Sequence, residues 1–315
     1  MGTTERAVPV LYVGGMPRSG STLLDLMLGE LTGHCEVGEL FYLWQSGVER
    51  NFRCACGEPF AGCPFWSKVG ELAYGGWSRV DLAEVYRLQR RVDATSRVPL
   101  VLAAGLLPAF RRSLDRYIAL ITPLYRAIAE VSGAAVVVDS TKRPSLAYIL
   151  RRAKGIDLRL VHVVRDPRGV AYSWSQAVEL PEGTAPRKHM KTRSPLLIAR
   201  RWVTVNAMLA WLAWLGVPRV RLRYEDLVRE PRAVLARVAA LTEDATGQRD
   251  PLGFLDGTTF THRGSHTVAG GRIRMRHGAI TLVLDEKWRR EYAPSRRRLV
   301  AALTWPLRWV YGYRG

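Results

Sequence analysis

The sequence predicts an α/β protein, a three-layer sandwich in which a central parallel sheet lies between two layers of helices. Short apolar runs rich in valine and leucine alternate with helical apolar spacing along most of the 315-residue chain. Strands that are buried on both faces have this continuous apolar character. The composition, 48% hydrophobic and 24% charged, excludes a disordered chain, a collagen and a small disulfide scaffold.

Four buried strands are expected, at residues 8–14, 134–138, 158–164 and 220–224. Helices are expected at 21–31, from about 114 to 130, from Asp166 onward, from 225 to about 241, and after Ser194, an N-cap that Pro195 follows. We therefore expect one domain over residues 1–315. A cysteine-containing and helical insertion at about 48–130 and a basic loop at 181–194 interrupt its regular order.

The charge of the chain points to an anionic partner. Lysine and arginine outnumber aspartate and glutamate by 47 to 28, a formal net charge of +19. Such a chain suits nucleic acid, an anionic membrane surface, or a phosphorylated or sulfated small molecule. No nucleic-acid recognition motif is present, so nucleic acid is not an expected partner. No signal peptide is recognisable, and the longest apolar candidate, 207–217, is too short to cross a bilayer. We expect a cytoplasmic protein.

The first predicted strand runs directly into the sequence GMPRSGST at 15–22 and then into a helix. Backbone N–H groups and the helix dipole converge at such a turn and create a cradle for anions. The spacing of Gly15, Gly20 and Thr22 fits the GxxxxGK[ST] loop of nucleotide kinases, but Ser21 replaces the lysine. This replacement argues against ATP or GTP phosphoryl transfer, and Arg18 supplies a cation instead.

A second anion-binding pair follows the strand at 158–164. Arg165 ends this strand, and Ser173 lies eight residues later, two turns into the next helix. An arginine at the carboxyl end of a strand and a serine on the adjoining helix can converge on one phosphate.

The segments PRSGSTLL (17–24) and RDPRGVAYS (165–173) resemble the 5′-phosphosulfate loop and the 3′-phosphate motif of sulfotransferases that use 3′-phosphoadenosine 5′-phosphosulfate (PAPS). RYED (223–226) and GGRIRMRHG (270–278) lie where that family has its adenine tyrosine and its last nucleotide loop. The resemblance implies a fold like that of P-loop nucleotide kinases, PAPS as co-substrate and adenosine 3′,5′-bisphosphate (PAP) as product. It implies nucleotide contacts from Pro17, Arg18, Ser19, Gly20, Ser21, Thr22, Leu23, Arg165, Ser173, Tyr224, Arg274 and Arg276.

Sulfuryl transfer needs a base near the acceptor, and a carboxylate is suited to deprotonate a hydroxyl. Bacterial and Golgi-type sulfotransferases carry a glutamate at the spacing of Glu39, which lies 22 residues after Pro17. The resemblance therefore implies that Glu39 is the base. Glu36 and His34 are its rivals.

The reaction also needs cations at the bridging oxygen, because the protein mainly positions the groups and stabilises charge. Arg18 is the first expected cation. Lys142 in DSTK (139–142) is the second, since tyrosine sulfotransferases have a lysine in a comparable place. These cations replace the magnesium of a nucleotide kinase, so no metal is expected to be required. Asp139 resembles the magnesium-binding aspartate of a kinase but is expected to orient Lys142 or the loop.

Three states are open to Cys35, Cys54, Cys56 and Cys63: free thiols, a Cys₄ zinc site, or disulfides. The spacing is not one of the strong zinc patterns, and disulfides need an oxidising compartment, so free thiols are favoured. The segment 54–66, which carries three aromatic residues, is expected to form part of the acceptor pocket.

The expected function is therefore transfer of the sulfuryl group from PAPS to a hydroxyl of a carbohydrate, glycolipid or secondary metabolite, by in-line displacement with a glutamate base. A P-loop kinase that uses ATP and magnesium is one alternative. A basic, non-catalytic protein that binds a nucleotide or nucleic acid is another. The basic loop at 181–194 suits an acceptor that already carries phosphate or sulfate, and it allows peripheral contact with an anionic membrane surface.

Overall fold

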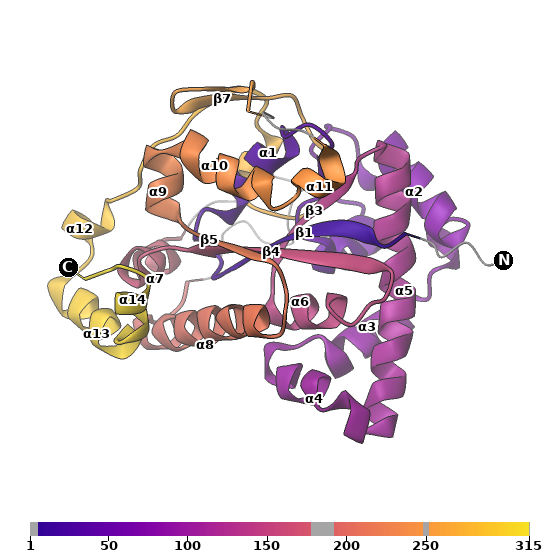
Figure 1. Cartoon of the computed structure of the whole chain (residues 1–315), viewed down its shortest axis with the longest axis horizontal. Coiled ribbons are helices and arrows are strands. Elements are labelled where there is room, and N and C mark those ends of the chain that lie inside the picture. The colour runs from indigo at the N-terminus through magenta and orange to yellow at the C-terminus, as the bar shows by residue number, and fades with distance from the viewer. Residues whose placement is uncertain (1–5, 178–191, 248–251, 315) are drawn as a thin grey trace.

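A five-stranded parallel sheet with the strand order β2-β3-β1-β4-β5 forms the centre of the molecule (Figure 1). The computed structural model describes residues 6–177, 192–247 and 252–314, so most of the predicted basic loop at 181–194 lies outside the described residues. The strands of the sheet are β1 (Val8–Gly15), β2 (His34–Glu36), β3 (Val136–Lys142), β4 (Ile156–Val164) and β5 (Arg219–Arg223).

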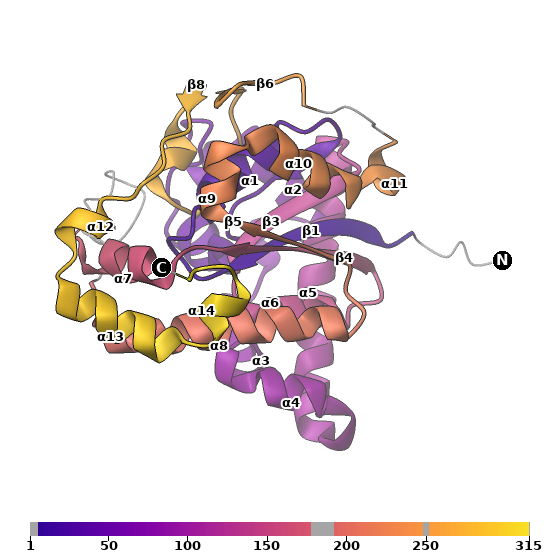
Figure 2. The same ribbon diagram turned by 60° about the vertical axis from the view of Figure 1, so that its left-hand side comes forward.

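Helices cover both faces of this sheet, which confirms the predicted three-layer α/β fold. Along β1, Val10 and Tyr12 face one core while Leu11 and Val13 face the other, because successive side chains of a strand point to opposite faces. One layer contains α5 (Pro108–Ser132), α6 (Pro144–Leu150) and α8 (Pro195–Trp214), and the other contains α1 (Ser21–Gly29), α9 (Tyr224–Arg229) and α10 (Pro231–Ala240) (Figures 1 and 2).

The four predicted strands are all present, with ends that differ by a few residues. The strand β2 was not predicted, because three residues at a sheet edge are too few for a hydrophobic period. The single helix predicted over 225–241 is divided into α9 and α10, since Pro231 begins a new helix after Glu230. Ser194 does cap α8, and its side chain accepts a hydrogen bond from the backbone N–H of Leu197.

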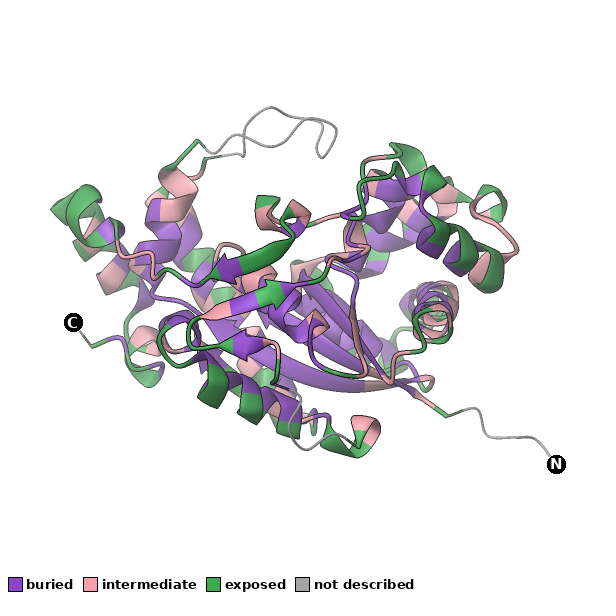
Figure 3. Ribbon diagram, turned by 90° about the horizontal axis from the view of Figure 1, so that it is seen from above, coloured by how far each residue is buried: buried purple, intermediate pink, exposed green. Residues whose placement is uncertain are grey.

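A small antiparallel sheet, also absent from the sequence prediction, packs with α1 on one side of the central sheet. Figure 3 shows the buried central strands enclosed by the other elements. The small sheet consists of β6 (Leu255–Asp256), β7 (Thr259–His262) and β8 (Gly278–Thr281). The remaining α-helices are α2 (Pro64–Tyr74), α3 (Leu82–Val92), α4 (Val98–Leu102), α7 (Pro167–Ser175), α11 (Glu243–Thr246), α12 (Trp288–Glu291), α13 (Pro294–Thr304) and α14 (Leu307–Val310).

The helix α8 contains most of the apolar run 207–217 that the sequence analysis considered as a membrane span. Among the described residues, it is the one helix that meets the length and composition of a membrane span. The sequence estimate begins at residue 207 because Asn206 and the Arg200–Arg201 pair interrupt the apolar run. In the fold, α8 lies along the central sheet and buries Ile198, Trp202 and Leu209 in its core.

Candidate active site

A cavity of about 1660 Å³ opens at the carboxyl ends of β1, β3 and β4, the usual place for a ligand in an open α/β sheet. Its walls include Pro17, Arg18, Gly20, Ser21, Thr22, Leu23, Glu39, Lys142, Arg165, Ser173, Tyr224 and Arg276. These are twelve of the fourteen residues that the sequence analysis assigned to the site. The other two, Ser19 and Arg274, are buried and do not line the cavity.

The loop after β1 is tightly packed against Tyr224. Gly20 caps α1 with a φ of +84°, a conformation that favours glycine. A Cβ atom at Gly20 would lie 2.4 Å from the Tyr224 ring. Arg18 also has a positive φ, of +74°, and this turn brings its side chain to the cavity wall. Both the backbone conformation and the lack of room for a side chain therefore require glycine at position 20.

Two residues of α7 hold the guanidinium of Arg18 at the cavity wall. It stacks on the Trp174 ring at 4.7 Å, and its Nη1 donates a hydrogen bond to the backbone oxygen of Ser173. Within the described part of the chain, its Nε and Nη2 have no hydrogen-bond partner. Burial lowers the pKa of Arg18. Two buried N–H donors thus remain available to a ligand. Because a buried donor without a partner is destabilising, a bound anion would stabilise this part of the protein.

The two predicted anion motifs meet at Arg165. Its Nη1 donates to the backbone oxygen of Arg18 at 3.0 Å, and its guanidinium lies over the Tyr224 ring at 4.6 Å. Its Nη2 donates to the carboxylate of Asp285 at 2.9 Å. Ser173 lies on α7 and lines the same cavity. The loops after β1 and β4 therefore form one positively charged end, which we call the phosphate end.

Glu39 and Lys142 form an ion pair in the cavity wall. The Nζ of Lys142 lies 2.7 Å from Oε1 of Glu39, and the two side chains are only 7% and 14% exposed. Lys142 ends β3 with a φ of +69°. The backbone N–H of Glu39 donates to the oxygen of Ala269 at 3.2 Å. The pair is thus fixed from two distant parts of the chain.

The two rivals of Glu39 lie elsewhere. Glu36 and His34 belong to β2 and line a separate cavity of about 780 Å³. The Glu36 carboxylate occupies the space beside Gly29, and its burial, together with the nearby Asp25, raises its pKa well above the ordinary range. Of the three proposed bases, Glu39 is the one that lines the main cavity.

The carboxylate of Asp139 is engaged inside the fold. Its Oδ2 accepts a hydrogen bond from the Tyr125 hydroxyl at 2.6 Å, and its Oδ1 accepts one from the backbone N–H of Thr141 at 2.8 Å. Burial raises its pKa to about 6. Asp139 thereby fixes the turn that leads to Lys142.

The segment 265–277 closes the cavity from the other side. The backbone N–H of Gly271 donates to Oγ1 of Thr22 at 3.3 Å, and the exposed Arg276 lines the cavity. Arg274 turns away and is 2% exposed. Its guanidinium donates to two backbone oxygens of the protein interior, those of Thr267 and Arg53.

Several lining residues were missed by the sequence analysis. Trp174 follows Ser173 directly, and its Nε1 donates to the oxygen of Pro17 at 3.2 Å. Arg200 and Arg201 line the cavity from α8, and the signal that marked them is two adjacent charges inside an otherwise apolar helix. Asp285 had no such signal, because its contact with Arg165 spans 120 residues.

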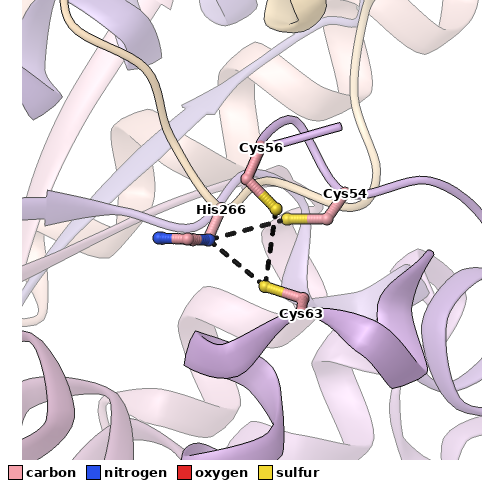
Figure 4. Close-up of side chains that lie close together, drawn as sticks. All are labelled: Cys54, Cys56, Cys63 and His266. Carbon is pink, nitrogen blue, oxygen red and sulfur yellow. Dashed lines mark hydrogen bonds between the residues drawn. The ribbon is translucent and has the colours of Figure 1, made fainter. Parts of the chain in front are cut away.

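Three cysteines and a histidine form a cluster outside this cavity (Figure 4). One ligand atom from each of Cys54, Cys56, Cys63 and His266 lies within 4.8 Å of the others. Cys35, the fourth residue of the Cys₄ site considered from the sequence, is not among them, and none of the four cysteines forms a disulfide. The sequence analysis missed His266.

No protein-family model matches the chain, and no curated protein sequence matches it. Among solved structures, it is similar to the sulfotransferase domain of the Synechococcus olefin synthase, with 19% identity over 96% of both chains and a TM-score of 0.47. It is also similar to the sulfotransferase domain of the curacin biosynthetic pathway (19% identity, 94% of this chain and 97% of the other, TM-score 0.47). A sulfotransferase from Mycobacterium avium matches at 15% identity over 77% of this chain and 64% of the other, with a TM-score of 0.38.

Proposed function

We propose that this protein transfers a sulfuryl group from PAPS to a hydroxyl of a small-molecule or glycolipid acceptor. The observation that carries the proposal is the convergence of two sets of residues on one cavity. Arg18 and Arg165 meet at its phosphate end, and the Glu39–Lys142 ion pair lines the same cavity. The motifs that resemble those of PAPS-dependent sulfotransferases contribute both sets.

The cavity suits a nucleotide with more than one anionic group. The unpartnered Nε and Nη2 of Arg18 and the backbone of the 17–23 loop would bind the 5′-phosphosulfate, while Arg165 and Ser173 would bind the 3′-phosphate. Tyr224 would contact the adenine. The volume of about 1660 Å³ exceeds the roughly 300–1,000 Å³ of a typical ligand pocket, so it has room for a donor and an acceptor together.

In the proposed reaction, the acceptor oxygen forms a bond to sulfur while the bond between sulfur and the bridging oxygen of the phosphosulfate breaks. Glu39 takes the proton of the acceptor hydroxyl as general base. Lys142 and Arg18 stabilise the negative charge that the departing phosphate oxygen gains. The ion pair of Lys142 and Glu39 holds both groups at the cavity wall before the reaction begins.

The kinase alternative is less well supported by these residues. Ser21 stands where a nucleotide kinase has its phosphate-binding lysine. Both carboxylate oxygens of Asp139, the residue that would serve a magnesium ion, accept hydrogen bonds from Tyr125 and Thr141. A non-catalytic nucleotide-binding protein would not need the Glu39–Lys142 pair and would convert no acceptor. Turnover by the wild-type protein that falls in the Glu39→Gln variant therefore distinguishes an enzyme from it.

Titration calorimetry of the wild-type protein and Arg165→Ala with PAP and with ATP–Mg²⁺ tests the donor. Wild type should bind PAP and bind ATP–Mg²⁺ weakly. The variant should bind PAP about 100-fold more weakly, because each hydrogen bond to a charged group contributes about 1.5–3 kcal/mol. Adenosine 5′-monophosphate, which lacks the 3′-phosphate, should lose far less affinity on the same substitution.

Arg168→Ala is the matched control, since Arg168 lies three residues after Arg165, in the first turn of α7, but pairs with Asp166 and stacks on Trp288. Tight binding of ATP–Mg²⁺ that ignores Arg165 would overturn the proposal in favour of a kinase.

The proposed acceptor side is basic. Arg200 and Arg201 line the cavity from α8 and suit an acceptor that already carries phosphate or sulfate. Screening acceptors with the purified protein and PAPS checks this: turnover of neutral phenols alone would contradict it. A cytoplasmic location and peripheral contact with an anionic membrane surface remain predictions from the sequence.

A further inference from the structure

The cysteine–histidine cluster has the geometry of a metal site. Sγ of Cys63 lies 3.3 Å from Nδ1 of His266 and 3.7 Å from Sγ of Cys56, and Sγ of Cys54 lies 3.8 Å from the same Nδ1 (Figure 4). A tetrahedral zinc ion, with Zn–S bonds of about 2.3 Å and Zn–N bonds of about 2.0 Å, separates two sulfur ligands by about 3.8 Å and a sulfur from a nitrogen by about 3.5 Å. These three separations are close to the edges of that tetrahedron, and all four ligand atoms lie within 4.8 Å of one another.

From this geometry we infer that Cys54, Cys56, Cys63 and His266 bind a zinc ion in a closed structural site, which we call the clasp. Three thiolates and one imidazole are a set that structural zinc uses, and soft sulfur ligands do not suit magnesium or calcium. The separation of 3.7 Å between the sulfur atoms of Cys56 and Cys63 is far longer than the roughly 2.05 Å bond of a disulfide. Four protein ligands leave no open position, so the ion would not take part in catalysis.

The local structure prepares the ligands for an ion. The backbone N–H of Gly57 donates to the oxygen of Cys54 at 3.0 Å, and this turn brings Cys54 and Cys56 to one side. Cys63 immediately precedes α2, whose helix dipole favours a thiolate at its amino-terminal end. The His266 ring stacks on Phe65 with centroids 4.7 Å apart, which fixes the orientation of Nδ1.

The surroundings also suit a negatively charged centre. Three thiolates around a divalent ion leave a net negative charge. The buried Arg274 brings the opposite charge close to the cluster, because it donates to the backbone oxygen of the residue before Cys54 at 3.1 Å.

The clasp joins two segments that are about 200 residues apart in the sequence. Between them, the backbone N–H of Ala55 donates to the oxygen of Thr267 at 2.9 Å. The same 265–271 segment then supplies the oxygen of Ala269 to Glu39 and the N–H of Gly271 to Thr22. Zinc would therefore hold this segment in place against the main cavity. The site does not depend on which reaction the cavity supports.

Metal analysis by mass spectrometry tests the clasp, with protein purified through a tag that contains no histidines. Wild type should contain one zinc ion per chain. Cys63→Ser and His266→Ala should lose zinc by more than about tenfold, since even outer-shell changes typically cost 10–100-fold in metal affinity. Cys35→Ser is the matched control, because Cys35 is a free thiol outside the cluster, and it should keep the full zinc content.

Replacement of zinc by cobalt in the wild-type protein provides a test that does not depend on whether the variants fold. Tetrahedral cobalt with three thiolate ligands should give intense visible bands. Hydrogen exchange before and after chelation should then show faster exchange in residues 263–277, while the central sheet is unchanged. Wild-type protein that contains no zinc and gives no such cobalt spectrum would overturn the inference. A zinc content that Cys63→Ser leaves intact would do the same.

Discussion

The phosphate end and the clasp are built in different ways. The phosphate end consists of two short segments, 15–23 and 165–173, each of which follows directly on its own strand. The clasp requires Cys54 and His266, which are separated by 212 positions. Strand ends bring chemistry together over a few residues, so that a single sequence reveals it. A ligand set closed by a distant loop becomes visible only once the chain is folded.

The two regions also differ in what they leave for a ligand. At the phosphate end, Arg18 keeps two buried donors that are unpartnered among the described residues. At the clasp, four ligand atoms face one another and leave nothing for a substrate. Changes at the phosphate end should therefore alter binding and turnover, whereas changes at the clasp should alter order and stability.

The largest effect is expected at Glu39, which pairs with Lys142 in the wall of the main cavity and also bonds to the loop that carries His266 of the clasp. Glu39→Gln should lower kcat by about 10²–10⁴, the usual contribution of a general base, and leave PAP affinity nearly unchanged. A turnover assay with PAPS and an acceptor that the wild-type protein uses measures kcat, and titration calorimetry measures the affinity for PAP.

Glu36→Gln is the control for that variant. Glu36 is buried away from the cavity, and its raised pKa means that a neutral amide resembles the form it has in the fold. Equal losses of turnover in the two variants would show that Glu39 acts only through stability.

Two glycines offer a smaller test of the same contrast. Gly20→Ala should destabilise the protein by about 2–4 kcal/mol, because it combines a strained positive φ with overlap with the Tyr224 ring. Gly57→Ala, in the cysteine turn, has a φ of +96° but open space around its Cβ, so it should cost only the strain of the positive φ, about 1–2 kcal/mol. Urea denaturation of both variants measures the difference, and equal costs would contradict the close packing of Gly20 against the Tyr224 ring.

The most gradual effect is a pH dependence of stability that originates at Asp25, in α1. Burial raises the pKa of Asp25 to about 8, whereas an unfolded aspartate ionises near about 3.9. Between these values the folded chain holds a proton that the unfolded chain has released. The free energy of unfolding therefore falls as pH rises, by at most about 1.4 kcal/mol per pH unit from this group.

Asp25→Asn should flatten this slope in denaturation experiments between pH 5 and pH 8. Glu58→Gln, which changes an exposed acid in the cysteine turn, should leave the slope as it is in the wild-type protein. A slope that Asp25→Asn does not change would assign the pH dependence to other buried acids.

The fold and the phosphate end were predictable because long buried strands and strand-end loops carry local signals. β2 was not, since its three residues have no measurable period and it forms only by pairing with β3. Arg274 and Arg276 were both assigned to the nucleotide because GGRIRMRHG (270–278) lies where the resembled family has its last nucleotide loop. A short 3₁₀ turn there directs Arg274 inward while Arg276 lines the cavity. Which arginine of such a run reaches a ligand is decided by the turn and not by composition.

The positive φ values of Arg18 and Lys142 set a limit on how this protein can be improved. Residues with a side chain pay about 1–2 kcal/mol for that conformation, and Asn51, at a φ of +50°, shows the kind of residue that adopts it with less strain. Glycine or asparagine at positions 18 and 142 would relax the backbone but remove the two proposed cations. Directed evolution for thermal stability alone would thus favour variants with a higher melting temperature and no catalytic activity, unless each round also selects for turnover.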